Sequence, residues 1–157
     1  MANVTLKNLN LRQFGNVPYG NVTNLVFALA TNAAGAAVNS DSAAAIASGD
    51  VIDLGPLPEG MRLDDASVFV TTGMTATITG SLGFKYADGV DSAEVPQDAA
   101  YFGTGIDLAA AGRKRATGSK LVTLPKPARL ILTTDVAANA KVSDIKVLVS
   151  GEQVGPR

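Results

Sequence analysis

The chain contains no cysteine and no histidine among its 157 residues. Without cysteine it has no disulfides and no thiolate nucleophiles, and most structural zinc sites are excluded. Without histidine, Ser-His-Asp and Cys-His catalysis are excluded, as are metal sites built on imidazole. Histidine is also the side chain whose ordinary pKa lies between about pH 5 and 8, so the usual proton shuttle is missing. These absences favour a structural protein over an enzyme.

Aromatic residues and long apolar runs are also scarce. Tryptophan is absent and aromatic residues make up 5% of the chain, which weighs against a carbohydrate-binding module with exposed stacking rings. The N-terminus, Met1 to Thr5, lacks the basic and apolar regions of a secretory signal. No apolar run approaches the length of a membrane span. The sequence predicts a soluble protein made in the cytoplasm, with no membrane partner and no cofactor.

Charge is unevenly distributed, although the net charge is only −1. Residues 48–100 carry nine acidic against two basic side chains, a net of −7, and residues 101–157 carry nine basic against four acidic, a net of +5. Residues 1–47 contribute the remaining +1. Two interpretations stay open. The charges intermix on one surface, or they form complementary patches that meet between copies or against a partner.

Alternation of apolar and polar residues is the clearest positive signal. Between Ile78 and Tyr86 the even positions are apolar or glycine, and the odd positions are polar or glycine. A period of two is typical of a β-strand with one dry face and one solvated face. Residues 61–72 show a similar pattern, and Gly73-Met74 form a bend before the next run. The sequence therefore predicts a hairpin over residues 61–86.

Short strand-like segments recur along the rest of the chain, separated by glycine and proline turns. They lie at residues 25–30, 50–54, 120–124, 128–134 and 142–150. A total of about seven to nine short strands predicts an all-β protein, either an antiparallel sandwich or a barrel.

Two segments depart from this strand pattern. Residues 1–22 are interrupted by Gly15, Pro18 and Gly20, and we interpret them as an N-terminal arm that precedes a β-domain of residues 23–157. Residues 105–112 are expected to form one short helix, with Thr104 as its N-cap and Gly112 beyond its C-terminus.

The motifs that match catalytic or nucleotide-binding patterns lack the context that the chemistry needs. Ser143-Asp144-Ile145-Lys146 matches S-x-x-K, but on a strand Ser and Lys point to opposite sides. Gly103-Thr104-Gly105 lacks the third glycine of a dinucleotide loop. Asp64 and Asp65 diverge on a strand, so they cannot form a glycosidase pair. Asp88-Gly89-Val90-Asp91 lacks the ligand series of a calcium loop. No catalytic residue and no metal ligand is predicted.

The densest basic run is Arg113-Lys114-Arg115. Exposure and the dipole of the expected helix account for it. The functional alternative is contact with an acidic partner surface. Without interleaved aromatic residues the run gives weak support for nucleic-acid binding, so no nucleic-acid partner is expected.

A series of short blocks between residues 48 and 150 has a recognisable order. Residues 49–60, Gly-Asp-Val-Ile-Asp-Leu-Gly-Pro-Leu-Pro-Glu-Gly, contain an L-G-x-L-P-x-G turn. The later blocks are Val68-Phe69-Val70, then Thr77 to Tyr86 followed by Ala-Asp-Gly, then Ala100-Tyr101-Phe102 leading to residues 105–113. In these blocks the chain resembles the decoration, or cement, proteins of tailed-bacteriophage capsids. The first 47 residues are not covered.

The resemblance implies a jelly-roll-like β-sandwich that binds the outer capsid surface of the virion at capsomer junctions and stabilises the shell. Its partners would be the major capsid protein and other copies of itself, with a trimer favoured over a dimer. Weak contacts to several subunits would add through effective concentration. The residues expected to contact the shell or a neighbouring copy are Leu6, Leu9, Leu11, Arg12, Phe14, Tyr19, Arg113, Lys114 and Arg115.

Two other functions stay open. One is a receptor- or glycan-binding β-sandwich of a phage fibre or cell surface. Binding to a glycan array without binding to capsids would favour this function. The other is a hydrolase that uses carboxylates, which substitution of the acidic residues would test.

Overall fold

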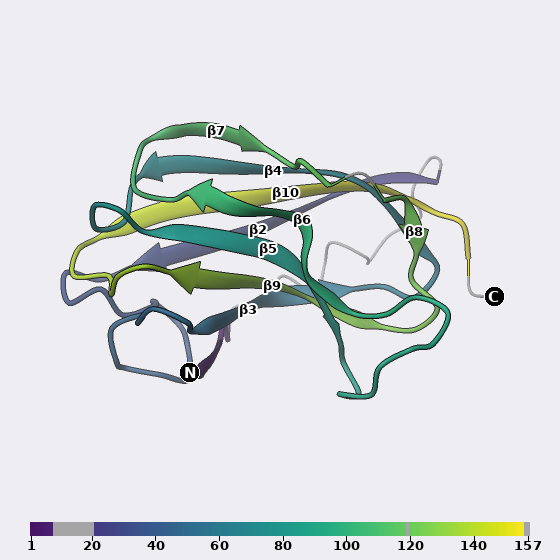
Figure 1. Ribbon diagram of the computed structural model, residues 1–157, viewed down its shortest axis with the longest axis horizontal. Helices are drawn as coiled ribbons and strands as arrows, with labels where there is room; N and C mark the ends of the chain where they lie inside the picture. Colours follow the sequence, from purple (N-terminus) through teal and green to yellow (C-terminus); the bar gives the residue numbers. More distant parts are fainter. Residues whose placement is uncertain (8–20, 119, 156–157) are drawn as a thin grey trace.

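Two β-sheets packed face to face make up the computed structural model of the chain, which describes residues 1–7, 21–118 and 120–155 (Figure 1). The first sheet has the order β1 (Asn3–Thr5), β3 (Val51–Leu57), β9 (Ala128–Asp135), β5 (Thr79–Tyr86) and β6 (Asp98–Asp107). The second has the order β2 (Val22–Thr31), β10 (Ser143–Gln153), β4 (Met61–Thr72) and β7 (Gly112–Arg115). The short β8 (Val122–Thr123) also pairs with β4.

The order of the strands within the two sheets is that of a jelly roll. Without β1 and β8, eight strands remain and can be counted from one to eight along the chain. In this count the second sheet has the order 1-8-3-6, and the first sheet has the order 2-7-4-5. All neighbours among these strands are antiparallel. Two sheets joined in this way by Greek-key connections form a double-sheet jelly roll. The predicted all-β, jelly-roll-like antiparallel sandwich is confirmed.

The core lies between the sheets and is supplied by alternate residues of both. In β5, Leu82, Phe84 and Tyr86 are each 1% exposed, as the alternation from Ile78 to Tyr86 predicts. The Phe84 ring makes edge-to-face contacts with Tyr86, at 5.8 Å between ring centres, and with Tyr101, at 5.5 Å. Fully burying one such side chain contributes about 1.5–3 kcal/mol, so this interior is the main source of stability.

The predicted hairpin over residues 61–86 is wrong, because β4 and β5 belong to different sheets. β4 pairs with β10, β7 and β8, whereas β5 pairs with β9 and β6. The connection crosses between the sheets at Met74, which is fully buried and donates its backbone N–H to the carbonyl of Leu108 at 2.9 Å. Alternation shows that a strand has one dry face, but in a sandwich consecutive strands can share that interior from opposite sheets.

The predicted short helix over residues 105–112 is also wrong, and no helix occurs in the described residues. Strand β6 continues to Asp107. The Asp107 carboxylate accepts hydrogen bonds from the backbone N–H groups of Ala109 and Ala110, at 2.9 and 3.1 Å. Leu108 is buried and donates its N–H to the carbonyl of Ile78 at 3.1 Å. Burial of Leu108 and pairing between distant segments override the helix propensity of the alanines.

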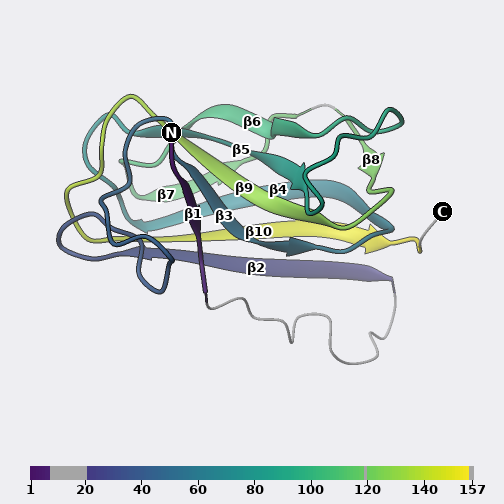
Figure 2. The ribbon, with the colours of Figure 1, turned by 90° about the horizontal axis from the view of Figure 1, so that it is seen from below.

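The N-terminal residues join the first sheet. β1 pairs in parallel with β3, and Figure 2 shows it beside that strand. Val4 and Leu6 are 2% and 6% exposed and belong to the hydrophobic core. Residues 8–20 of the predicted arm lie outside the described residues, so the division at residue 22 stays a prediction.

Candidate functional site

The strand connections gather at the two ends of the sandwich, and the two ends differ in chemistry (Figure 1). One end, on the left in Figure 1, carries residues 32–35, 73–78, 108–111 and 136–142. We call these four stretches the neutral end, because Lys141 is their one ionisable side chain and alanine is their commonest residue. The opposite, charged end carries residues 58–60, 87–97 and 124–127 and contains five ionisable side chains: Glu59, Asp88, Asp91, Glu94 and Lys126.

A buried asparagine ties the neutral end together. Asn139 is 1% exposed, and its Nδ2 donates to Thr31 Oγ1 at 3.1 Å and to the carbonyl of Lys141 at 2.9 Å. Its Oδ1 accepts from the backbone N–H of Thr75 at 3.0 Å and from Thr75 Oγ1 at 3.2 Å. Its own N–H donates to the carbonyl of Ile46 at 2.8 Å. A satisfied buried network of this kind holds separate loops in one arrangement.

Two β-branched residues at the neutral end have left-handed backbone conformations. Thr77 has φ of 73° and Val136 has φ of 79°. This conformation is costly for a branched side chain, about 1–3 kcal/mol each, and persists only where the surroundings impose it. Both side chains are exposed to solvent. Strain of this kind concentrates at binding and active sites, which makes the neutral end a candidate functional surface.

The neutral end also contains an open hollow of about 470 Å³. Its lining includes Met74, Ala76, Thr77, Asp107, Ala110 and Lys141. The N–H groups of Ala110 and Ala109 donate to the Asp107 carboxylate and hold its pKa below the ordinary value. The ammonium of Lys141, in contrast, makes no ion pair with any residue that the structure describes. The hollow is therefore lined by methionine, alanine and threonine side chains, together with the Asp107 carboxylate and the Lys141 ammonium.

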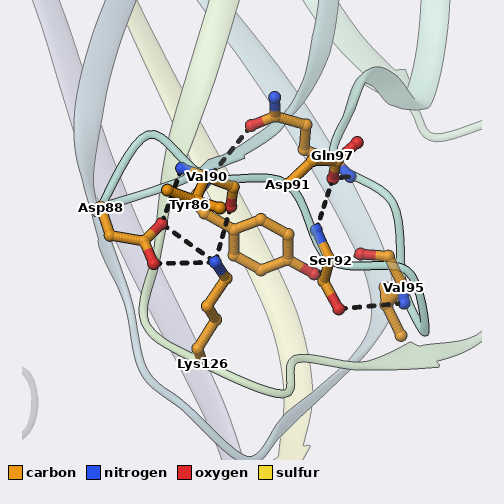
Figure 3. Close-up of polar contacts among 8 residues, drawn as sticks. All are labelled: Tyr86, Asp88, Val90, Asp91, Ser92, Val95, Gln97 and Lys126. Atoms are coloured by element: carbon orange, nitrogen blue, oxygen red, sulfur yellow. Dashed lines mark hydrogen bonds and ion pairs between the residues drawn. The ribbon is translucent and has the colours of Figure 1, made fainter.

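At the charged end, Lys126 closes the connection between β5 and β6 (Figure 3). Its Nζ donates to Asp88 Oδ2 at 2.8 Å and to the carbonyl of Val90 at 2.6 Å, and lies 4.6 Å from the centre of the Tyr86 ring. The hydrogen bond from Lys126 is the largest cause of a lowered pKa at Asp88. The Tyr86 hydroxyl donates to the carbonyl of Val95 and anchors the other side of the connection. We call this arrangement the lysine latch.

Replacing Lys126 by methionine keeps a long side chain and removes the ammonium. Near neutral pH we expect amide hydrogens of residues 88–97 to exchange faster in the variant, because Asp88 and Val90 lose their donor. The pKa of Asp88 in the folded protein lies below its ordinary value of 3.8. The stabilisation that the Asp88–Lys126 pair provides is therefore complete above pH 3.8 and is lost as the pH falls through the folded pKa. The ratio of variant to wild-type exchange rates should therefore fall in acid toward a smaller value, set by the bond from Lys126 to the Val90 carbonyl, which does not depend on the charge of Asp88.

Hydrogen-exchange mass spectrometry over a pH series measures this ratio, and intrinsic exchange chemistry cancels in it. Lys146→Met is the matched control, because Lys146 lies on the other sheet, 3.8 Å from Asp144. An exchange rate for residues 88–97 that is the same in wild type and in K126M near neutral pH would show that the latch does not hold the connection.

The predicted basic run forms the edge strand β7, where each side chain has an interaction within the chain. The Arg113 guanidinium lies 5.1 Å from the centre of the Phe69 ring. Lys114 Nζ lies 3.9 Å from Asp107, and Arg115 pairs with Asp65. Basic residues on an edge strand also discourage unwanted strand pairing, which is a structural reason for the run.

The other predicted contact residues divide into two groups. Leu6 is buried in the core. Leu9, Leu11, Arg12, Phe14 and Tyr19 lie outside the described residues. Lys141, Thr77 and Asn139 were not among the residues predicted from the sequence. The shortage of charge in the alanine-rich connections is the signal that could have identified this region.

The described residues include no group of three or more acidic, histidine or cysteine side chains placed to hold a metal ion. Within the same residues no helix has the length and apolar character needed to cross a membrane.

The jelly roll of this chain is shared with chains in two solved phage structures. The capsid of Ralstonia phage GP4 contains a chain that superposes with a TM-score of 0.67 and 20% sequence identity, over 99% of this chain and 99% of that chain. The capsid asymmetric unit of cyanophage Pam1 contains one with a TM-score of 0.57 and 15% identity, over 87% of this chain and 89% of that chain. No protein-family profile and no characterised protein matches the sequence. The chain is therefore similar, along nearly its whole length, to the fold of a chain found in a phage capsid.

Proposed function

We propose that this protein is a structural component of a phage particle, a decoration protein that binds the outer surface of the assembled capsid and stabilises it. The observation that carries the proposal is the likeness in fold over 99% of both chains to a chain of a phage capsid. The sequence blocks between residues 48 and 150 support it independently, since they resemble those of decoration proteins.

The molecule suits a role in bridging. The two ends of its sandwich and its basic edge strand offer chemically different surfaces. A copy at a capsomer junction would contact several subunits of the major capsid protein, and weak contacts would add through effective concentration. Arg113, Lys114 and Arg115 on β7 are proposed to meet a neighbouring copy, with a trimer as the favoured assembly. Because only the assembled shell is bound, binding raises its stability by mass action.

The test is to add the purified protein to capsids that lack it. We expect saturable binding in co-sedimentation and a higher temperature of shell disruption. Failure to associate with the shell would reject the proposal, and glycan-array hits without capsid binding would favour a fibre or receptor-binding module instead.

A further inference from the structure

We propose that the neutral end is the face through which this protein docks on the shell. In the docked state a capsid subunit places a small uncharged side chain in the hollow and a carboxylate opposite Lys141. This inference rests on the proposed function, because it names the end of the molecule that the shell covers.

The neutral end can be covered by a partner at little cost in lost hydration. A charge that loses its hydration without gaining a partner costs several kcal/mol, so a docking face is best kept uncharged. The four stretches of the neutral end contain a single ionisable residue, whereas the charged end contains five in a smaller number of residues. Val136 and Val142 at the neutral end are 65% and 53% exposed, so apolar area is available to bury.

The Lys141 ammonium at the neutral end is complementary to one acidic group on a partner. Lys141 lines the same hollow as Ala76 and Thr77, and its ammonium has no ion pair among the described residues. At the charged end, by contrast, Lys126 already binds Asp88 and the carbonyl of Val90. The Asp107 carboxylate in the same lining is already bound by two backbone N–H groups and lies 3.9 Å from Lys114, so Lys141 is the charge that a carboxylate of the partner surface would pair with.

The loops of the neutral end are preorganised for binding. Loops that must become ordered on binding reduce affinity, whereas loops already fixed do not. The Asn139 network joins the end of β2 to the connections that follow β2, β4 and β9. The strained backbone at Thr77 and Val136 shows that the surroundings hold these loops in one arrangement. Alanine side chains add contact area without loss of side-chain entropy.

The same features argue against a second copy of this chain as the occupant. Two neutral ends that met across a two-fold axis would bring their Lys141 ammonium groups to the same surface, where like charges repel. A neutral end packed against the charged end of the next copy would desolvate the acidic side chains there. A shell subunit avoids both costs.

The test compares Ala76→Glu and Lys141→Glu with the control Ala93→Glu, an exposed alanine at the charged end. We expect the two variants at the neutral end to bind capsids that lack the protein at least about tenfold more weakly than wild type. A76E fills the hollow with a charged side chain that competes with the shell for Lys141, and K141E repels the carboxylate of the shell. The control should bind like wild type. Circular dichroism and thermal melting establish that all three variants remain folded.

The outcomes separate this inference from the proposed function. If wild type binds the shell and both neutral-end variants bind equally well, the docking face is wrong and the decoration role stands. If wild type fails to bind, both are rejected. If the variants change the mass of the protein in solution while shell binding is unaffected, the neutral end is an interface between copies, and docking on the shell through it is overturned.

Discussion

Replacing Asn139 by alanine is expected to lower the free energy of unfolding by about 2–4 kcal/mol, because several buried groups lose their partner at once. The backbone N–H of Thr75 loses its acceptor, and the carbonyl of Lys141 loses one of its donors. The side chain is 1% exposed, so water cannot replace these bonds without opening the end of the sandwich. Urea denaturation followed by circular dichroism measures the loss.

Asn24→Ala is the matched control for this substitution. Asn24 lies on the exposed face of β2, where its Oδ1 is bonded to Ser150 Oγ at 2.7 Å. Loss of an exposed polar contact changes stability by less than about 0.5 kcal/mol. Equal losses in the two variants would mean that the Asn139 network does not hold these three connections together, and the argument that the neutral end is preorganised would lose its main support.

The buried and exposed faces of the strands could be predicted from the sequence, because the burial of a residue is reflected in its own polarity. The even positions of β5, such as Leu82 and Phe84, are buried, and so are Ala66, Val68 and Val70 of β4. Each of these residues is apolar because its side chain is buried. The period of two can be recognised within one strand, without identifying the strand that pairs with it. For this reason the interior of the sandwich followed from the pattern alone.

The partners of the strands and the candidate site could not be predicted in this way. Residues 61–72 and 78–86 would show the same alternation of apolar and polar residues whether the two strands pair with each other or face each other across the core. Asn139 stands in an alanine-rich stretch, and its partners Thr75 and Thr31 are 64 and 108 positions away in the sequence. Local propensity favoured a helix near residues 105–112, but distant contacts of Leu108 decide its conformation. Such contacts leave no periodic signal.

Replacing Phe84 by alanine is expected to lower the free energy of unfolding by about 3–5 kcal/mol, the cost of lost apolar burial plus the cavity left behind. The ring is 1% exposed and lies between Tyr86 and Tyr101 in edge-to-face contacts. Because β5 pairs with both β9 and β6, neighbouring strands restrict any collapse into the cavity. Urea denaturation provides the measurement.

Phe69→Ala is the matched control, since it removes the same ring from the outer face of β4. Phe69 is partly exposed there, with the Arg113 guanidinium 5.1 Å from the ring centre. A partly exposed ring that loses a cation–π contact should cost about 1 kcal/mol. The ratio of the two decreases in the free energy of unfolding therefore shows whether an aromatic ring stabilises the protein more in the interior or on the outer face of the second sheet. A larger loss at Phe69 than at Phe84 would place the stabilising apolar surface on the outside of the second sheet, which is incompatible with a sandwich held together by the interior between its sheets.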